Sequence, residues 1–164
     1  MSSGNTSQDQ ERAQEFWEEG VTELMSGRIY SAIDCFNQSI LHCPTAEGHT
    51  YRGWALSFLG MLDQAIQDCK KAIEIDPDFG NPYNDIGVYL MQIGLLDDAI
   101  PWFEKAKGAA RYIPRHFPFL NLGHIYVAKE DQNKALEEYV QALDLDPENP
   151  AILKAIASLD LKVN

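Results

Sequence analysis

Residues 81–106, NPYNDIGVYLMQIGLLDDAIPWFEKA, decide the fold. Their apolar residues recur at helical spacing, but Gly87 interrupts the first run and Gly94 breaks the pattern before a second run begins. Glycine costs about 1 kcal/mol relative to alanine inside a helix, so its presence there needs a reason. We interpret Gly87 as a close-packing position, where a neighbouring helix lies too near for a Cβ atom.

The same arrangement occurs four times along the chain. Glycines recur at separations of 33, 34 and 36 residues, at Gly20, Gly53, Gly87 and Gly123. Twelve residues after each glycine lies an alanine, at Ala32, Ala65, Ala99 and Ala135. Seven residues after each glycine, where the chain is expected to turn, lie Gly27, Gly60, Gly94 and Glu130. Sixteen residues after each glycine lie Phe36, Cys69, Phe103 and Tyr139.

Proline, which cannot continue a helix, closes three of the copies, at Pro44, Pro77 and Pro147. A period of about 34 residues with these small, aromatic and proline positions resembles the tetratricopeptide repeat. The resemblance covers nearly the whole chain, although Glu23 fills a usually apolar position and Arg111 replaces a closing proline. It implies an all-α fold, a right-handed superhelical solenoid of antiparallel helix pairs with four repeats and a C-terminal capping helix. The junction at residues 72–87 resembles those of many stand-alone bacterial members of the family.

The period also predicts where the parts of the chain begin and end. We expect a flexible tail at residues 1–10 and a single repeat domain at residues 11–164. The repeats are expected at about 13–45, 46–79, 80–113 and 116–149, with the capping helix at 150–162. The paired helices are expected at about 11–26 and 29–42, 46–59 and 62–75, 80–93 and 96–110, and 115–128 and 132–145. Asp97 is the expected N-cap of the sixth helix.

Composition restricts the classes of function. The 164 residues include 25 acidic and 13 basic side chains, and the net charge of −12 argues against nucleic acid, whose phosphates require clustered lysine and arginine. No apolar run approaches the roughly 20 residues of a membrane span. The first ten residues lack the basic start and apolar centre of a secretory signal. Three cysteines without a CxxC pair favour reduced thiols, so we expect a cytoplasmic protein.

Positive charge gathers at the junction of the third and fourth repeats, at Lys105, Lys107, Arg111, Arg115 and His116. It is explained either by favourable charge at a helix C-terminus with a solvated connection, or by a rim contact for an acidic partner. The same junction contains the 36-residue spacing, so two residues are inserted within residues 108–118. We expect a bend or a widened gap between repeats there.

The resemblance implies which side chains face the concave surface. From the first two repeats these include Trp17, Val21, Tyr51, Trp54 and Phe58. From the last two repeats they include Asn84, Asp85, Val88, Met91, Asn121 and His124. Exposed aromatic and apolar side chains are typical of binding hot spots, so we predict that this groove binds an apolar helix or extended segment of a partner protein. Trp17 and Phe58 could instead belong to the core, and Asn84 and Asn121 either bond a ligand backbone or are solvated.

One subclass of the family grips the acidic C-terminus of heat-shock chaperones with a clamp of lysine, asparagine and arginine side chains. In one frame its positions hold Trp17, Val21, Tyr51, Asn81 and Asp85. In the other frame they hold Thr50, Trp54, Asp85, Phe117 and Asn121. Neither frame supplies a cation for a carboxylate. We therefore expect that this chain is not a clamp-type partner of heat-shock chaperones.

Catalytic and metal-binding patterns are weak in this sequence. The four histidines occur singly along the predicted helices, no phosphate loop, nucleophile elbow or HExxH pair occurs, and His49 fits a packing position. We expect no catalytic residue, cofactor or metal, and a non-enzymatic interaction scaffold. The alternatives are a chaperone for a secreted hydrophobic protein, similar to type III translocator chaperones, and a self-assembling homo-oligomer. An enzyme would need its site around Asp85, Asn121 and His124.

Overall fold

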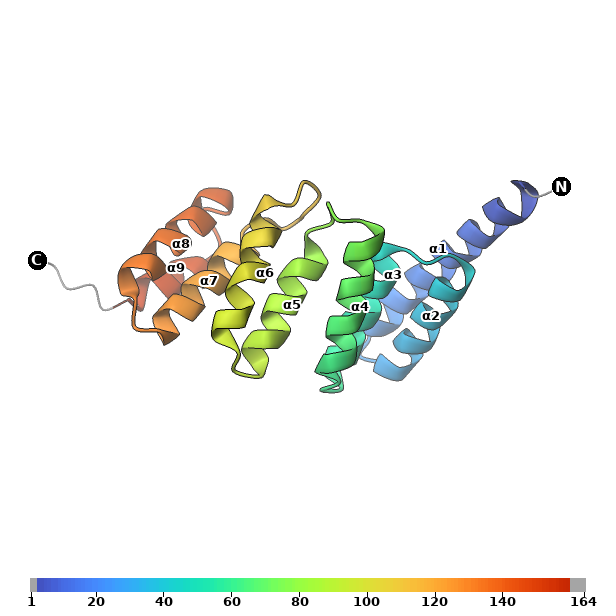
Figure 1. The fold of residues 1–164 in the computed structure, drawn as a ribbon, viewed down its shortest axis with the longest axis horizontal. Coiled ribbons are helices and arrows are strands. Elements are labelled where there is room, and N and C mark those ends of the chain that lie inside the picture. The colour runs from blue at the N-terminus through green and yellow to red at the C-terminus, as the bar shows by residue number, and fades with distance from the viewer. Residues whose placement is uncertain (1–2, 160–164) are drawn as a thin grey trace, which may run out of the picture.

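The computed structural model describes residues 3–159, and their side chains from residue 7 onward. Within this range nine helices follow one another. The first eight stack as antiparallel pairs along the long axis of the molecule, and α9 packs on the last pair (Figure 1). The helices are α1 Ser3–Met25, α2 Ile29–His42, α3 Ala46–Phe58, α4 Leu62–Ile75, α5 Asn81–Gln92, α6 Leu96–Gly108, α7 Phe117–Ala128, α8 Gln132–Leu145 and α9 Pro150–Ala157. The expected all-α repeat solenoid is confirmed.

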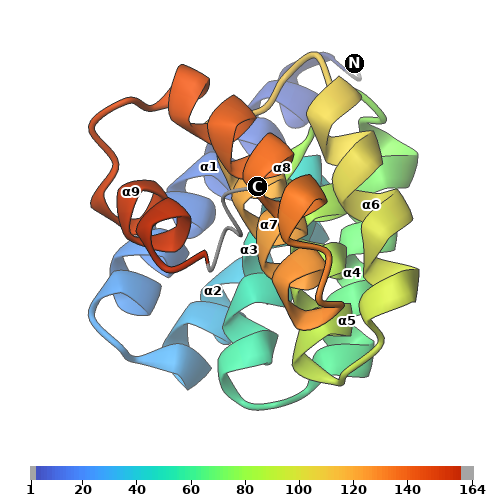
Figure 2. The ribbon, with the colours of Figure 1, turned by 90° about the vertical axis from the view of Figure 1, so that its left-hand side faces the viewer.

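Two layers of helices build the solenoid. Each odd-numbered helix packs against the even-numbered helix that follows it, and α1, α3, α5 and α7 also contact one another from repeat to repeat. Seen from the C-terminal end, the successive pairs are rotated about the long axis (Figure 2). The odd-numbered helices therefore form the inner layer, and their free face is available for binding.

Close packing at the glycines is confirmed in each helix pair. A Cβ atom added at Gly20 would lie 2.6 Å from the Phe36 ring, and one added at Gly87 would lie 2.6 Å from the Phe103 ring. At Gly53 the nearest atom is the backbone oxygen of Ala65, 3.0 Å from an added Cβ atom, while the smaller Cys69 leaves its Sγ atom at an ordinary contact distance of 3.5 Å. The aromatic partners are fully buried, so they cannot move aside.

The turns within the pairs lie at the expected positions. Gly27, Gly60 and Gly94 have φ angles of 75°, 72° and 82°, in the left-handed region that glycine adopts without strain. Glu130 occupies the fourth position with a φ angle of 61°. The repeat geometry thus imposes the left-handed turn even where the sequence provides no glycine.

A buried polar network joins α3 to α4. The Nδ1 atom of His49 lies 3.0 Å from Oδ1 of Asp68, and Arg52 donates hydrogen bonds of 2.7 and 2.6 Å to the two oxygens of the same carboxylate. Burial alone would raise the pKa of Asp68, but the hydrogen bonds from Arg52 and His49 outweigh it and hold this pKa below its usual value. His49 is therefore a packing residue of the helix pair.

The two ends of the chain differ in how well the sequence predicted them. α1 begins at Ser3, so residues 3–10 are helical where we expected a flexible tail, and Asp9 on this first part lies 3.5 Å from His42 of α2. At the other end α9 covers the last repeat as expected, with Ile152 buried and Ile156 packed against the same cluster. α9 ends at Ala157, so residues 158 and 159 are not helical as we expected, and the expected part of this helix beyond residue 159 lies outside the described residues.

The N-cap prediction at Asp97 is wrong. α6 begins one residue earlier, at Leu96, with Leu95 in the N-cap position and no side-chain cap. Asp97 lies in the first turn, where a negative charge is favourable, and its carboxylate pairs with Lys129.

Among the described residues no helix combines the length and the apolar character that crossing a membrane requires.

The glycine packing generates a direct test. Gly87→Ala should lower the free energy of unfolding by about 2 kcal/mol, because the new methyl group meets a buried ring. The matched control is Gly108→Ala near the end of α6, where an added Cβ atom meets nothing within 4 Å. Urea unfolding followed by circular dichroism measures both variants. Equal stability of the two variants would contradict the packing role.

Candidate partner-binding groove

A cavity of about 490 Å³ opens on the inner helices of repeats two to four. Its walls come from α3, α5 and α7 and from the connection between α6 and α7. The lining residues are Thr50, Tyr51, Trp54, Asn81, Asn84, Asp85, Val88, Tyr112, Ile113, Pro114, Phe117 and Asn121. We call this space the groove cavity.

Four aromatic side chains form a continuous row from α1 to the end of α3. The ring centroids of Trp17 and Tyr51 lie 5.2 Å apart, those of Tyr51 and Trp54 5.8 Å, and those of Trp54 and Phe58 5.8 Å. Such edge-to-face and tilted contacts are favourable for aromatic pairs. Trp17, Tyr51 and Trp54 are partly buried, whereas Phe58 is 59% exposed. We call this row the aromatic strip.

The floor of the groove cavity is polar. The Nδ2 atom of Asn121 donates to Oδ1 of Asn84 over 3.1 Å, and the Nδ2 atom of Asn84 lies 3.4 Å from Oδ1 of Asp85. Burial raises the pKa of Asp85 to about 7, an effect that the hydrogen bond from Asn84 opposes only in part. Near neutral pH this carboxyl group is therefore divided between its charged and neutral forms.

The connection between α6 and α7 forms one wall of the groove cavity. It is held to the preceding junction by backbone hydrogen bonds of 2.9 Å, from Gly80 N to Arg111 O and from Arg111 N to Asp78 O. The Arg111 guanidinium pairs with Asp76 and, over 2.7 Å, with Glu47 of α3. The connection therefore lies against the inner helices, whereas the expected bend or widened gap between the repeats stays a prediction.

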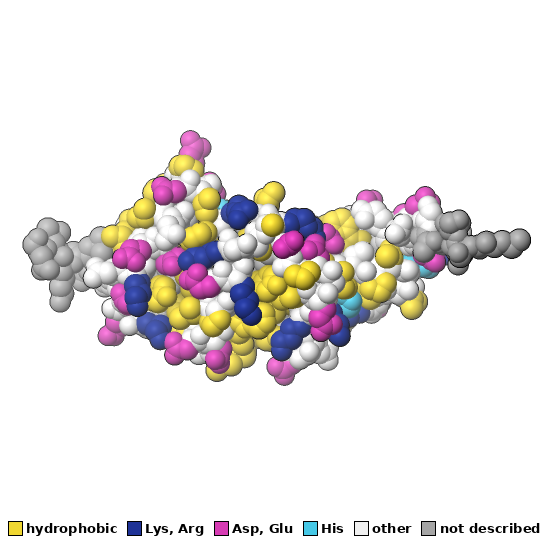
Figure 3. Space-filling model, turned by 45° about the horizontal axis from the view of Figure 1, so that its top comes forward, with side chains coloured by type: hydrophobic (Ala, Val, Ile, Leu, Met, Phe, Trp, Pro, Cys, Tyr) yellow, Lys and Arg dark blue, Asp and Glu magenta, His cyan; other side chains and the backbone are white. Residues whose placement is uncertain are grey.

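The remaining basic residues of this junction also contact groups within the chain. Lys107 lies 3.1 Å from Glu104 and 2.9 Å from Glu138, and Arg115 donates to the carbonyl oxygen of Ala109 over 3.3 Å. Figure 3 shows an apolar area near the middle of the molecule bordered by basic and acidic side chains. These internal contacts favour the first interpretation of the basic segment, a charged helix end with its connection.

Comparison with known proteins agrees with the repeat geometry. A tetratricopeptide repeat family model matches residues 46–79, and a second model of the same repeat matches residues 123–159. The chain belongs to the tetratricopeptide repeat family. Members of this family are typically non-catalytic scaffolds that mediate protein–protein interactions.

Among curated relatives of this repeat protein is the small glutamine-rich tetratricopeptide repeat-containing protein 2 of Mycosarcoma maydis. It is 32% identical over 100 residues, which are 60% of this chain and 28% of the relative. The probable assembly chaperone of rpl4 from Emericella nidulans is 30% identical over 117 residues, 62% of this chain and 30% of that relative. The chain thus spans less than a third of either relative. Among solved structures, Pseudomonas aeruginosa pilF has a TM-score of 0.86 at 20% identity, covering 92% of this chain and 68% of that one.

The repeat protein brings together six of the eleven predicted site residues. They line the groove cavity, and they are Tyr51, Trp54, Asn84, Asp85, Val88 and Asn121. Trp17 lines an adjoining cavity, and Phe58 extends the aromatic strip beyond it. Val21 and Met91 are partly buried against the cores between helices. His124 is exposed with its ring 5.6 Å from Tyr139, away from the cavity lining.

Sequence reasoning missed the contribution of the connection. Tyr112, Ile113 and Pro114 line the cavity from one side, and Phe117 lines it from the start of α7. The available signal was the two-residue insertion, which marks a connection too long for a simple turn between helices. Only the long-range contacts of Arg111 show where these residues lie.

Asp85 provides a test of the electrostatics of the groove. Because its pKa is higher in the folded than in the unfolded state, the folded protein binds more protons between about pH 4 and 7, so wild-type stability falls as pH rises through this window. Asp85→Asn removes this titration and should stabilise the protein at about pH 8 by on the order of 2 kcal/mol. The gain should shrink toward pH 5.

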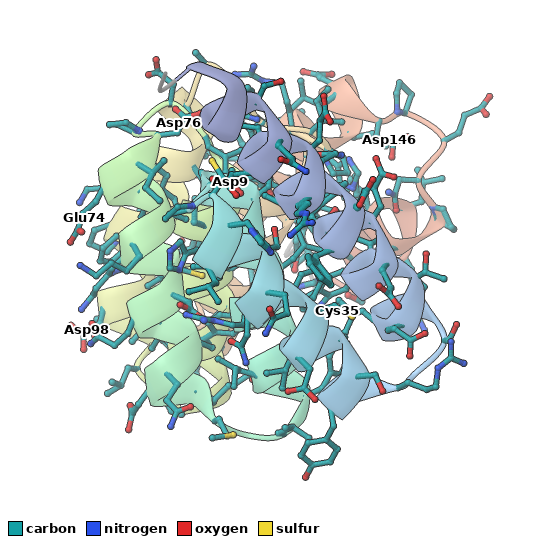
Figure 4. The ribbon with its side chains drawn as sticks, turned by 90° about the vertical axis from the view of Figure 1, so that its right-hand side faces the viewer. Asp9, Cys35, Glu74, Asp76, Asp98 and Asp146 are labelled. Carbon is teal, nitrogen blue, oxygen red and sulfur yellow. The ribbon has the colours of Figure 1, made fainter. Side chains whose placement is uncertain are left out.

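The matched control is Asp98→Asn, which removes an equal charge from an exposed position on α6 (Figure 4). Urea unfolding at both pH values measures the difference for each variant. If Asp85→Asn is no more stable than Asp98→Asn at the higher pH, Asp85 is not a carboxyl group of raised pKa.

Proposed function

We propose that the groove binds a helical or extended segment of a partner protein and that the chain acts as a non-enzymatic adapter. The aromatic strip carries this proposal. It presents Trp54 and the 59% exposed Phe58 beside a cavity of about 490 Å³. Large exposed aromatic side chains next to a concave site are typical of binding hot spots.

The polar floor supplies hydrogen bonds for the backbone of such a segment. A carboxamide has one acceptor oxygen and two N–H donors. One donor of Asn121 is used by Asn84, so Asn121 keeps its oxygen and a second N–H for a ligand. We therefore propose that the aromatic strip binds apolar anchors while Asn121 bonds the backbone between them.

A chaperone role is the second candidate, and the name of the Emericella nidulans relative favours it. In that case the groove would shield an apolar segment of a client, including that of a secreted protein, before the client reaches its final partner. Self-assembly would instead place a segment of a second copy in the groove.

The proposed location is the cytoplasm, because the three free cysteines, Cys35, Cys43 and Cys69, are consistent with a reducing compartment.

Affinity capture tests the adapter proposal. The wild-type chain and a Trp54→Ala, Phe58→Ala double variant are compared as baits in a lysate of the source organism. The control is Tyr30→Ala, which removes a 74% exposed aromatic side chain from α2 in the outer layer. We expect the same proteins to be retained by wild type and control and lost from the double variant, because the loss of two anchors removes several kcal/mol of binding energy.

Circular dichroism establishes that all three baits are equally helical. Retention of the same proteins by the double variant would contradict the groove as the binding site. If the wild-type bait retains only further copies of itself, self-assembly is favoured over the adapter function.

A further inference from the structure

The Asp85 carboxylate has no counter-ion among the described residues. Its one side-chain hydrogen bond, from Asn84, is long at 3.4 Å. Within the part of the chain that the structure describes, no lysine, arginine or histidine nitrogen lies within 4.0 Å of its oxygens. Partial burial of a carboxylate without a counter-ion is unfavourable. The groove cavity therefore contains a partly buried carboxylate that no cation of the described residues pairs.

The groups around Asp85 favour a positively charged ligand. Tyr51 and Trp54 line the same cavity, and aromatic faces attract ammonium and guanidinium groups. Tyr112, which is 4% exposed, also lines the cavity, and its hydroxyl group has no hydrogen-bond partner among the described residues. The Tyr112 hydroxyl oxygen is itself buried, so the carboxylate of Asp85 is the acceptor that a cation in the cavity would bond.

Among the described residues, the ionisable groups that respond to the charge of Asp85 are weak acids. Burial raises the pKa values of Tyr51, Cys69, Tyr89 and Tyr112, and the nearby Asp85 carboxylate raises them further. All four are neutral acids below their own pKa values. Two arginines, Arg111 and Arg115, line the adjoining cavity, but Arg111 is paired with Asp76 and Glu47 and Arg115 donates to a backbone carbonyl.

We propose that the groove cavity is a cation pocket, in which Asp85 and the rings of Tyr51 and Trp54 hold the lysine or arginine side chain of a partner segment. This inference rests on the proposed function and specifies its partner as a basic segment with apolar neighbours. An apolar side chain at this place would leave the carboxylate unpaired, and an acidic one would be repelled. The net charge of −12 also attracts basic segments over longer distances.

Small alkyl cations test the pocket without knowledge of the partner. Amide signals of the folded protein are followed by NMR while n-butylammonium, a mimic of the lysine side chain, is added. The neutral comparison is 1-butanol, and the protein variants are Asp85→Asn and Asp98→Asn. Asparagine keeps the shape of aspartate but not its charge, and Asp98 stands on the outer layer (Figure 4).

We expect saturable shifts at Asn84, Asp85 and Tyr112 with n-butylammonium in the wild type and in Asp98→Asn. In Asp85→Asn the affinity should fall by about tenfold, and 1-butanol should not reproduce the shifts. No saturable shift at these residues, equal shifts with 1-butanol, or unchanged affinity in Asp85→Asn would each overturn the cation pocket. If n-butylammonium does not bind but affinity capture succeeds, the cation pocket alone is overturned. If n-butylammonium binds but affinity capture fails, the adapter proposal is overturned.

Discussion

The close approach of the two helices in each pair is the constraint on which the rest of the structure depends. Gly20 and Gly87 receive the buried rings of Phe36 and Phe103 at distances that leave no room for a Cβ atom. Because interiors are packed to high density, the contact fixes how one helix lies on the next. Repetition of the same contact in successive repeats then produces a solenoid with an inner layer of α1, α3, α5 and α7.

The same constraint separates the packing face of each inner helix from its free face. On α5, Gly87 packs toward α6, while Asp85 and Val88 line the groove cavity. The residues of the free face need not satisfy the helix pair, so their chemistry is available for binding. A carboxyl group of raised pKa beside partly buried aromatic rings is unfavourable for stability, which is typical of sites that serve function rather than folding.

The helices were predictable because their signal is local and repeated. Glycine, alanine and aromatic positions recurring every 33 to 36 residues located the eight paired helices within two residues at nearly every end. The extension of α1 to Ser3 was missed because residues 3–10 are polar and have no apolar period. The wall formed by the α6–α7 connection was missed because it depends on Arg111 and Glu47, which are 64 residues apart. Six groove residues followed from the family pattern. The lack of a counter-ion for Asp85 among the described residues could be found only once three elements of the fold were placed together.

Site-specific photo-cross-linking tests the central claim, that the concave groove holds a partner segment. A benzophenone-bearing phenylalanine replaces Phe58 or Phe117, which are 59% and 41% exposed beside the groove cavity, or Tyr30 on the outer layer. Mass spectrometry then identifies the cross-linked peptides. The account predicts that both groove positions capture one partner segment with a lysine or arginine among apolar residues. Capture of a partner from Tyr30 alone, with none from either groove position, would contradict it.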